Sequence, residues 1–335
     1  MKKIRCLLLC LTLIFVMLPI PVFAQRKVTI KLVSLVPENT PWGNLLNRLS
    51  VEWKEATNGE VTLQIYHNNQ SNEADVIRKL NMNQIQAAVL STLGMKLINP
   101  PIMTLSCPFL IRDNQELDVV LNALKPEMEK GINDKGYFTL AWSKIGWVRF
   151  FSKSPVFVPA DLKKQKLGTI ETEQEMMDIF KAMGYQMTPV ATEHILVNLS
   201  GGLIDAVYQS PVIAGGLQIF GLARNMASIP VAPFLGSIVM TQRAWRSIPE
   251  KYRPELLRLV KRVEAELDHS VQALENEVID TMVRYGLVIN QVSPQQAALW
   301  YADTARAMPS LIGSTFDKAL YERITSLLEA HRARR

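Results

Sequence analysis

The chain is 335 residues long and 48% of its residues are apolar, which is enough to bury a core and longer than a single core usually supports, so we expect two domains. The formal net charge is +6, but both signs are mixed along the chain and the only basic run is the terminal His331-Arg332-Ala333-Arg334-Arg335. This pattern argues against a nucleic-acid partner.

The first 24 residues have the pattern of a signal peptide. Three basic residues within positions 1–5 precede an apolar run over 6–18, and Val22-Phe23-Ala24 is a small-residue cleavage site. The run is shorter than the roughly 20 residues that a membrane helix needs, although an uncleaved anchor is the alternative. We expect cleavage before Gln25 and export to the periplasm.

The cysteines indicate a protein that is stabilised by its hydrophobic core and not by disulfides. Cys6 and Cys10 lie inside the signal segment, at positions unlike a lipid-attachment site, so the mature chain keeps only Cys107 and forms no internal disulfide. Cys107 lies in an apolar stretch, and we expect a buried small hydrophobic residue rather than a nucleophile.

The mature chain begins with alternating strands and helices. Residues 28–36 predict a strand, and Thr40-Pro41 is typical of the N-cap and first residue of a helix. A strand over 61–65, a helix over 73–83 and a short buried strand over 87–90 complete a βαβαβ order. This order predicts a parallel sheet wrapped by helices.

The pattern recurs in the second half of the chain. We expect a strand over 165–170, a helix over 173–183, a second helix over 193–199 and a strand over 204–208. The predicted fold class is α/β, with two lobes of similar construction.

A long helix follows, from about 249 to 285. Its apolar residues are spaced three or four apart in one stripe, Ser247-Ile248-Pro249-Glu250 resembles a capping box, and Gly286 would end it. At about 1.5 Å per residue it would be roughly 55 Å long, so we expect it to bridge both lobes; a coiled-coil dimer helix is the alternative. A last capped helix should begin at Ser293-Pro294-Gln295-Gln296.

Motifs of enzyme chemistry are missing from the sequence. It has no nucleophile elbow, phosphate-binding loop, paired-histidine motif or Cys-x-x-Cys, and its four histidines are scattered without metal-ligand spacing. We therefore expect no catalytic residue, no metal and no cofactor.

Seven short motifs, taken in order, resemble a known family. They are Pro41-Trp42-Gly43, Asn58-Gly59-Glu60-Val61, Cys107-Pro108-Phe109-Leu110, Gly146-Trp147-Val148-Arg149, Pro159-Ala160-Asp161-Leu162-Lys163, Gly202-Leu203-Ile204-Asp205-Ala206 and Ile248-Pro249-Glu250-Lys251-Tyr252. Together they cover nearly all of the mature chain. They resemble the extracytoplasmic solute-binding subunits of TRAP (tripartite ATP-independent periplasmic) transporters, a family typified by C4-dicarboxylate and sialic acid uptake.

This resemblance implies a two-lobed solute-binding fold, joined by hinge strands and the long helix, that closes on a small molecule. Residues 25–146 and 235–270 would form lobe I, and residues 147–234 and 271–335 lobe II. The protein would deliver its ligand to the small and large membrane permease subunits, with or without a periplasmic helical-repeat helper protein. Two other functions stay open: a ligand sensor that uses the same fold for signalling, and a secreted enzyme.

One position departs from the family. Members carry Lys-Ile-Arg in the strand after the Asp-Leu-Lys turn, and the resemblance implies that this arginine grips the ligand carboxylate; here the triplet is Lys166-Leu167-Gly168. Loss of that charge-assisted contact should weaken carboxylate binding about 10- to 150-fold. The family's second cleft arginine is retained as Arg149.

Strand ends indicate the rest of the site, because ligands of open α/β sheets lie beyond the carboxyl ends of the strands. This rule places six further residues near the cleft: Trp42, Ser91, Thr92, Tyr208, Gln209 and the hinge-region Phe234. If the aromatic residues line the cleft beside Gly168, the ligand is less polar than a dicarboxylate, with one polar or anionic end at Arg149. Packing in the core is the alternative for the aromatic residues.

Overall fold

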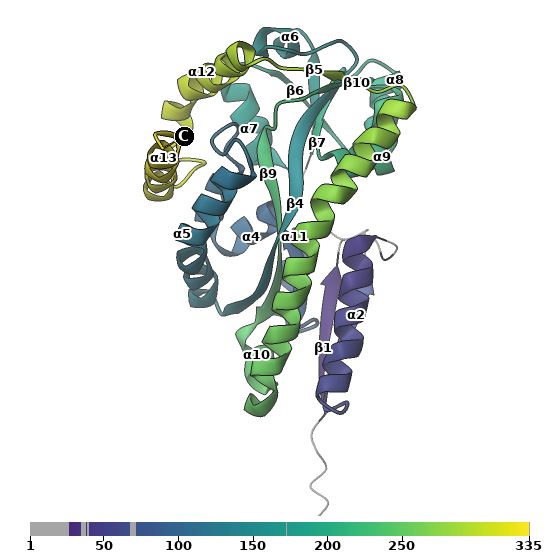
Figure 1. Ribbon diagram of the computed structural model, residues 1–335, viewed down its shortest axis with the longest axis vertical. Helices are drawn as coiled ribbons and strands as arrows, with labels where there is room; N and C mark the ends of the chain where they lie inside the picture. The colour runs from purple at the N-terminus through teal and green to yellow at the C-terminus, as the bar shows by residue number, and fades with distance from the viewer. Residues whose placement is uncertain (1–26, 35–37, 39, 68–71, 172, 335) are drawn as a thin grey trace, which may run out of the picture.

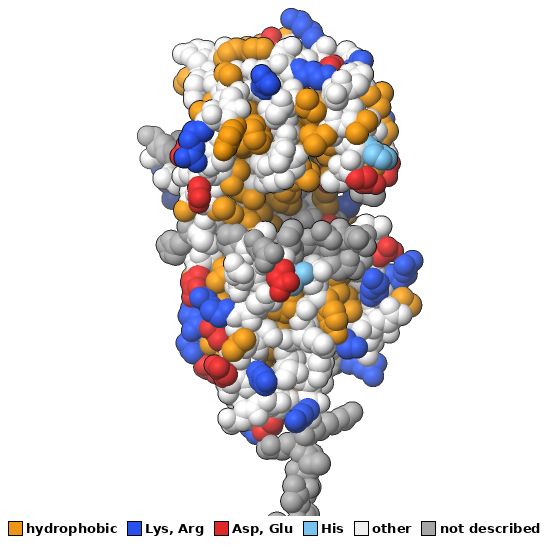
Figure 2. Space-filling model, turned by 90° about the vertical axis from the view of Figure 1, so that its right-hand side faces the viewer, with side chains coloured by type: hydrophobic (Ala, Val, Ile, Leu, Met, Phe, Trp, Pro, Cys, Tyr) orange, Lys and Arg blue, Asp and Glu red, His pale blue; other side chains and the backbone are white. Residues whose placement is uncertain are grey.

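The computed structural model describes residues 27–334 except 35–37, 39, 68–71 and 172, and has the mixed α/β architecture that the sequence predicts (Figure 1). The predicted signal peptide and its cleavage site lie outside the described residues. Figure 2 shows two masses with a constriction between them, which are the two lobes. Among the described residues, no helix is both long and apolar enough to cross a membrane.

The first lobe contains the predicted parallel strands. β1 (Val28–Ser34) pairs in parallel with β2 (Val61–His67) and with β3 (Ala87–Ser91). α2 (Pro41–Ala56) and α3 (Glu73–Asn81) connect them. The predicted cap of α2 is confirmed, since the hydroxyl oxygen of Thr40 accepts a hydrogen bond from the Gly43 N–H at 3.1 Å.

The second lobe repeats this arrangement. β5 (Lys166–Ile170) pairs in parallel with β6 (Gln186–Val190) and with β7 (Ala206–Gln209). α7 (Gln174–Ala182) connects β5 to β6, and α8 (Ile195–Ser200) precedes β7. Both predicted parallel sheets are therefore confirmed.

Two antiparallel strands that sequence patterning does not reveal join the lobes. β4 (Tyr137–Ser152) has 16 residues, which at about 3.3 Å each makes a strand of roughly 50 Å. It pairs with β9 (Ala232–Thr241) on the first-lobe side, and with β7 and β8 (Asn225–Ala227) on the second. The strand order is β2-β1-β3-β9-β4-β7-β5-β6, and β8 also pairs with β10 (Val288–Asn290).

The expected bridging helix is α11 (Arg253–Arg284), 32 residues and therefore about 48 Å long. Figure 1 shows it extending along both lobes, and its packing agrees, because Leu256 lies in the first-lobe core and Met282 in a second-lobe core. The predicted capping box at its start is wrong. Ser247 is instead the last residue of α10 (Gln242–Ser247), and its hydroxyl donates to the Ala244 carbonyl oxygen at 2.7 Å.

The part of the chain that the structure describes contains six further α-helices. They are α4 (Thr92–Ile98), α5 (Asn114–Asp134), α6 (Pro159–Lys163), α9 (Pro211–Gly216), α12 (Pro294–Leu311) and α13 (Lys318–Arg332). The capping box of α12 is confirmed, since the Ser293 hydroxyl accepts from the Gln296 N–H at 3.3 Å and the Gln296 side chain accepts from the Ser293 N–H at 2.8 Å. Cys107 is 1% exposed in the core between α7 and α12, as expected.

The C-terminal helix bears on the division into lobes. α13 packs against α5, and its residues Leu320, Ile324 and Leu328 are buried in the first-lobe core. The predicted boundaries placed residues 271–335, and therefore α13, in lobe II. The packing of α13 against α5 favours lobe I for this helix, and the boundaries as a whole stay a prediction.

Candidate functional site

The carboxyl ends of β3 and β5 belong to different lobes and meet at one place. α4 follows β3 directly and α7 follows β5, and the Lys96 ammonium of α4 forms an ion pair with the Glu175 carboxylate of α7. Lys96 is only 12% exposed. The two lobes are therefore joined here by a contact between charged side chains.

Glu73 occupies the first-lobe side of this place. Its carboxylate accepts hydrogen bonds from the Ser91 N–H at 2.5 Å and the Ser91 hydroxyl at 2.8 Å. Burial raises the pKa of Glu73, while the bonds from Ser91 and the charge of Lys96 act in the opposite direction. Gly94 lets the carboxylate approach, because a Cβ there would lie 2.5 Å from Glu73 Oε1.

Glu173 occupies the second-lobe side, between β5 and α7. Glu173 is the N-cap residue of α7, and its side chain accepts no capping hydrogen bond from the first turn of that helix. Glu173 keeps some solvent contact but is surrounded by protein. The pKa of Glu173 is raised to about 7, mainly by burial and also by the charges of Glu73 and Glu175, while the charge of Lys96 opposes the rise.

Tyr208, at the end of β7, lies beside Glu173. Its ring packs against Phe150 and Phe180, with centroids 6.0 and 5.2 Å away. Burial raises the pKa of the Tyr208 hydroxyl strongly, and the charge of Glu173 adds to this. Thr169 of β5 is on the same face as Tyr208 and 4% exposed, and its hydroxyl has no hydrogen-bond partner within the described part of the chain.

Arg149 lies on β4, where its Cα pairs with that of Gln209. Its guanidinium donates to the Ser228 carbonyl oxygen and lies 3.8 Å from the carboxylate of Glu275, a residue of α11 whose side chain is 3% exposed. Burial lowers the pKa of Arg149 and Glu275 counteracts it. The charge of the predicted ligand-binding arginine is thus already matched inside the protein.

Gly168 is enclosed. A Cβ at this position would lie 2.7 Å from Ile204 Cδ1 and 3.5 Å from the Ala206 carbonyl oxygen. An arginine therefore could not replace Gly168 without displacement of Ile204, whose side chain fills the space next to it.

The other predicted site residues fall into different surroundings. Trp42 is 8% exposed within the first-lobe core, and its indole N–H lacks a partner among the described residues. Thr92 is 3% exposed, with its hydroxyl 3.5 Å from the Leu235 carbonyl oxygen. Phe234 is opposite Gly146 on β9 and β4, and the Gln209 side chain accepts from the Ser210 N–H at 3.0 Å.

The structure therefore forms two groups from the predicted residues. Ser91 and Tyr208 lie at the strand ends near Glu73 and Glu173. Arg149 and Phe234 lie on the strands that join the lobes, and Gln209, the last residue of β7, pairs with Arg149. Sequence analysis missed the charged residues of the strand-end group. The available signal was an acidic residue at the start of each helix that follows a strand, as at Glu73 and Glu173.

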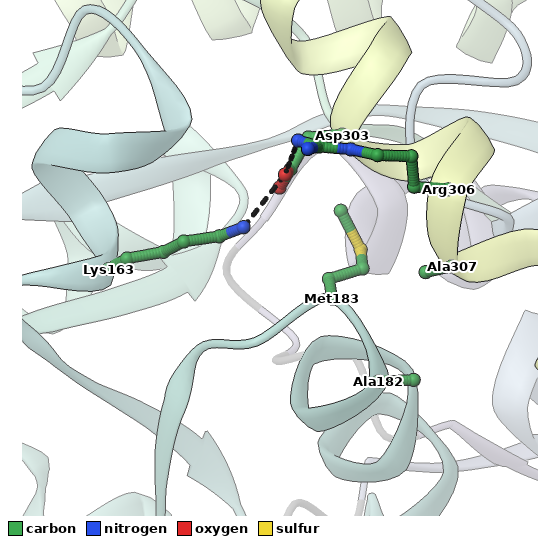
Figure 3. Close-up of a pocket in the computed structure, with 6 residues that line it drawn as sticks. All are labelled: Lys163, Ala182, Met183, Asp303, Arg306 and Ala307. Atoms are coloured by element: carbon green, nitrogen blue, oxygen red, sulfur yellow. Dashed lines mark hydrogen bonds and ion pairs between the residues drawn. The ribbon is translucent and has the colours of Figure 1, made fainter.

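A shallow pocket of about 170 Å³ lies elsewhere (Figure 3). In it Lys163 and Arg306 both reach Asp303, each at 2.7 Å. Lys163 precedes β5 and Met183 follows α7, so the pocket is at the amino ends of the strands, opposite the cleft. These contacts tie α6 to α12.

The described residues contain no cluster of three or more His, Cys, Asp or Glu that could hold a metal ion.

Comparison with known proteins agrees with this architecture. Residues 32–312 match the family described as bacterial extracellular solute-binding protein, family 7. A solute-binding protein of Chromohalobacter salexigens is 23% identical over 272 residues, which are 78% of each chain. The C4-dicarboxylate-binding protein DctB of Bacillus subtilis is 21% identical over 82% of this chain and 80% of its own.

Solved structures of the same kind share the fold. A TRAP periplasmic solute-binding protein from Ochrobactrum anthropi superposes with a TM-score of 0.84 at 13% identity, over 93% of this chain and 98% of that one. Another, from Ralstonia eutropha and with bound (S)-2-acetolactate, gives 0.80 at 17% identity over 92% and 100%. The two-lobed fold is therefore confirmed. Because the family match covers most of its length, the chain belongs to family 7 of the bacterial extracellular solute-binding proteins, the solute-binding subunits of TRAP transporters.

Proposed function

We propose that this protein captures a small organic solute between its lobes in the periplasm and delivers it to the small and large permease subunits of a TRAP transporter. Membership of the family supports the capture of a solute and the transport role. The protein would act by binding and release, without catalysis. A helical-repeat helper protein would be an additional partner.

The proposed ligand is less polar than a dicarboxylate, with one polar or anionic end. The observation that carries this is Gly168, because Ile204 fills the space next to it and Arg149 is left as the one arginine expected for the cleft. Arg149 is itself paired with Glu275. A second carboxylate would therefore be buried without a matching cation, which is unfavourable. A related protein from Sulfurospirillum deleyianum was solved with bound succinate; this chain should bind succinate poorly.

Calorimetry against C4-dicarboxylates, monocarboxylates of increasing chain length and neutral apolar compounds tests this proposal. We expect a monocarboxylate to bind at least about tenfold more tightly than succinate, since one charge-assisted contact is absent. Arg149→Ala should weaken its binding, whereas Arg258→Ala, at an exposed position of α11, should not. Circular dichroism would verify folding of both variants. Micromolar succinate binding that survives Arg149→Ala would refute the proposal.

We also propose that export precedes function, with cleavage before Gln25. Protein recovered from the periplasm should begin at Gln25 on N-terminal sequencing and contain only one cysteine. Periplasmic protein that still begins at Met1 would instead indicate an uncleaved segment.

A further inference from the structure

The strand-end group has more carboxylates than cations. Among the described residues, one ammonium, that of Lys96, lies beside three carboxylates, those of Glu73, Glu173 and Glu175, and it is in contact with Glu175. Arg149 adds no free positive charge, since Glu275 already lies against it. With every group ionised, the cleft therefore holds an excess of negative charge.

Hydrogen-bonding groups beside this excess also lack partners. The Thr169 hydroxyl is buried, with the residue 4% exposed, and no described residue bonds to it. Tyr208 lies on the same face, and the charge of Glu173 acts on its hydroxyl. A buried hydroxyl left unpaired is unfavourable, so the arrangement favours a bound group that forms a hydrogen bond with Thr169 beside the Glu173 carboxylate.

We infer that the cleft takes a ligand with a protonated amine, which lies between Glu73 and Glu173 and donates hydrogen bonds to their carboxylates. The inference rests on the proposed function, because it presumes that a solute is captured at this place. An ammonium group supplies several N–H donors and one positive charge, and both match what the cleft lacks. Together with an anionic end, it would make the ligand a zwitterion.

The inference predicts a pH dependence of binding. Four titratable groups surround Glu173, namely Glu73, Lys96, Glu175 and Tyr208. Burial is the main cause that raises the pKa of Glu173 to about 7, and the charge of Glu73 adds to it. An amine binds the ionised carboxylate, so binding releases a proton from Glu173. Affinity should then rise as the pH increases through about 7 and level off above it. An anionic group at the same place would show the reverse trend.

Four-carbon compounds with and without an amine test the inferred amine site. Calorimetry would compare 4-aminobutanoate and n-butylamine with 4-hydroxybutanoate and butanoate at pH 6 and pH 8. We expect both amines to bind, about tenfold more tightly at pH 8 than at pH 6, as one linked proton with a pKa of about 7 requires. Glu173→Gln should weaken amine binding by about 10- to 150-fold and abolish its pH dependence. Glu171→Gln, an exposed position of the same connection, is the matched control and should change neither.

Four results would each overturn the inference: no amine binding at millimolar concentration, equal affinity for the hydroxyl analogue, tighter amine binding at pH 6, or unchanged amine affinity in Glu173→Gln. If monocarboxylates bind and amines do not, the proposed function stands and the amine site fails. If no solute of either panel binds, both fail.

Discussion

Glu275 connects α11 to β4, two of the elements that extend across both lobes. Its carboxylate accepts from the Trp147 N–H of β4 at 3.3 Å and lies beside Arg149. It reaches β4 at Gly146, which has a positive φ of 125° and where a Cβ would overlap the carboxylate. A glycine is therefore required at this contact between α11 and the hinge strand.

Removal of the Glu275 carboxylate should destabilise the folded protein. Glu275→Ala leaves the Arg149 charge buried without its partner, so we expect the free energy of unfolding to fall by about 3–5 kcal/mol. Glu275→Gln, which keeps an acceptor for Trp147, should lose less. Urea denaturation would measure both against Glu277→Gln, an exposed control on the same helix that should stay within about 0.5 kcal/mol of wild type. Equal stability of Glu275→Ala and wild type would show that solvent compensates the Arg149 charge.

Two similar serine motifs take different positions relative to a helix: one caps the start of a helix and the other lies at the end of one. Ser293 precedes α12 and forms the reciprocal capping box with Gln296. Ser247 precedes Pro249 and Glu250 in a comparable pattern, but it ends α10 and donates to the turn behind it. α11 therefore begins later, after a 3-10 turn at Glu250–Tyr252. A cap motif predicts a helix start only where no preceding helix uses its hydroxyl.

We expect the two lobes of the molecule to rotate toward each other and close on a bound ligand. β4, β9 and α11 all extend from one lobe to the other, so rotation of the lobes must be absorbed by these elements. The Lys96 and Glu175 pair joins the lobes directly. It is a partly exposed pair and should be worth at most about 1 kcal/mol.

Small-angle X-ray scattering tests this closure. A ligand found by calorimetry should reduce the radius of gyration at saturation, because the lobes close on it. Glu175→Gln should increase the radius of the ligand-free protein, because it removes the contact between α4 and α7, and Asp178→Asn, on the exposed side of α7, should not. A radius that does not change on saturation would contradict closure.

The sequence by itself determined the two α/β halves, the long helix and the buried Cys107, because strand alternation, helix caps and apolar stripes are local patterns that neighbouring residues specify. It also indicated the departure at Gly168. Only the tertiary structure decided how β4 and β9 cross between the lobes, that Glu275 matches the charge of Arg149, and that Glu73 and Glu173 meet although they are a hundred positions apart in the chain. Pairing between distant charges depends on how strands from separate lobes are brought together, and no periodicity within either segment encodes that.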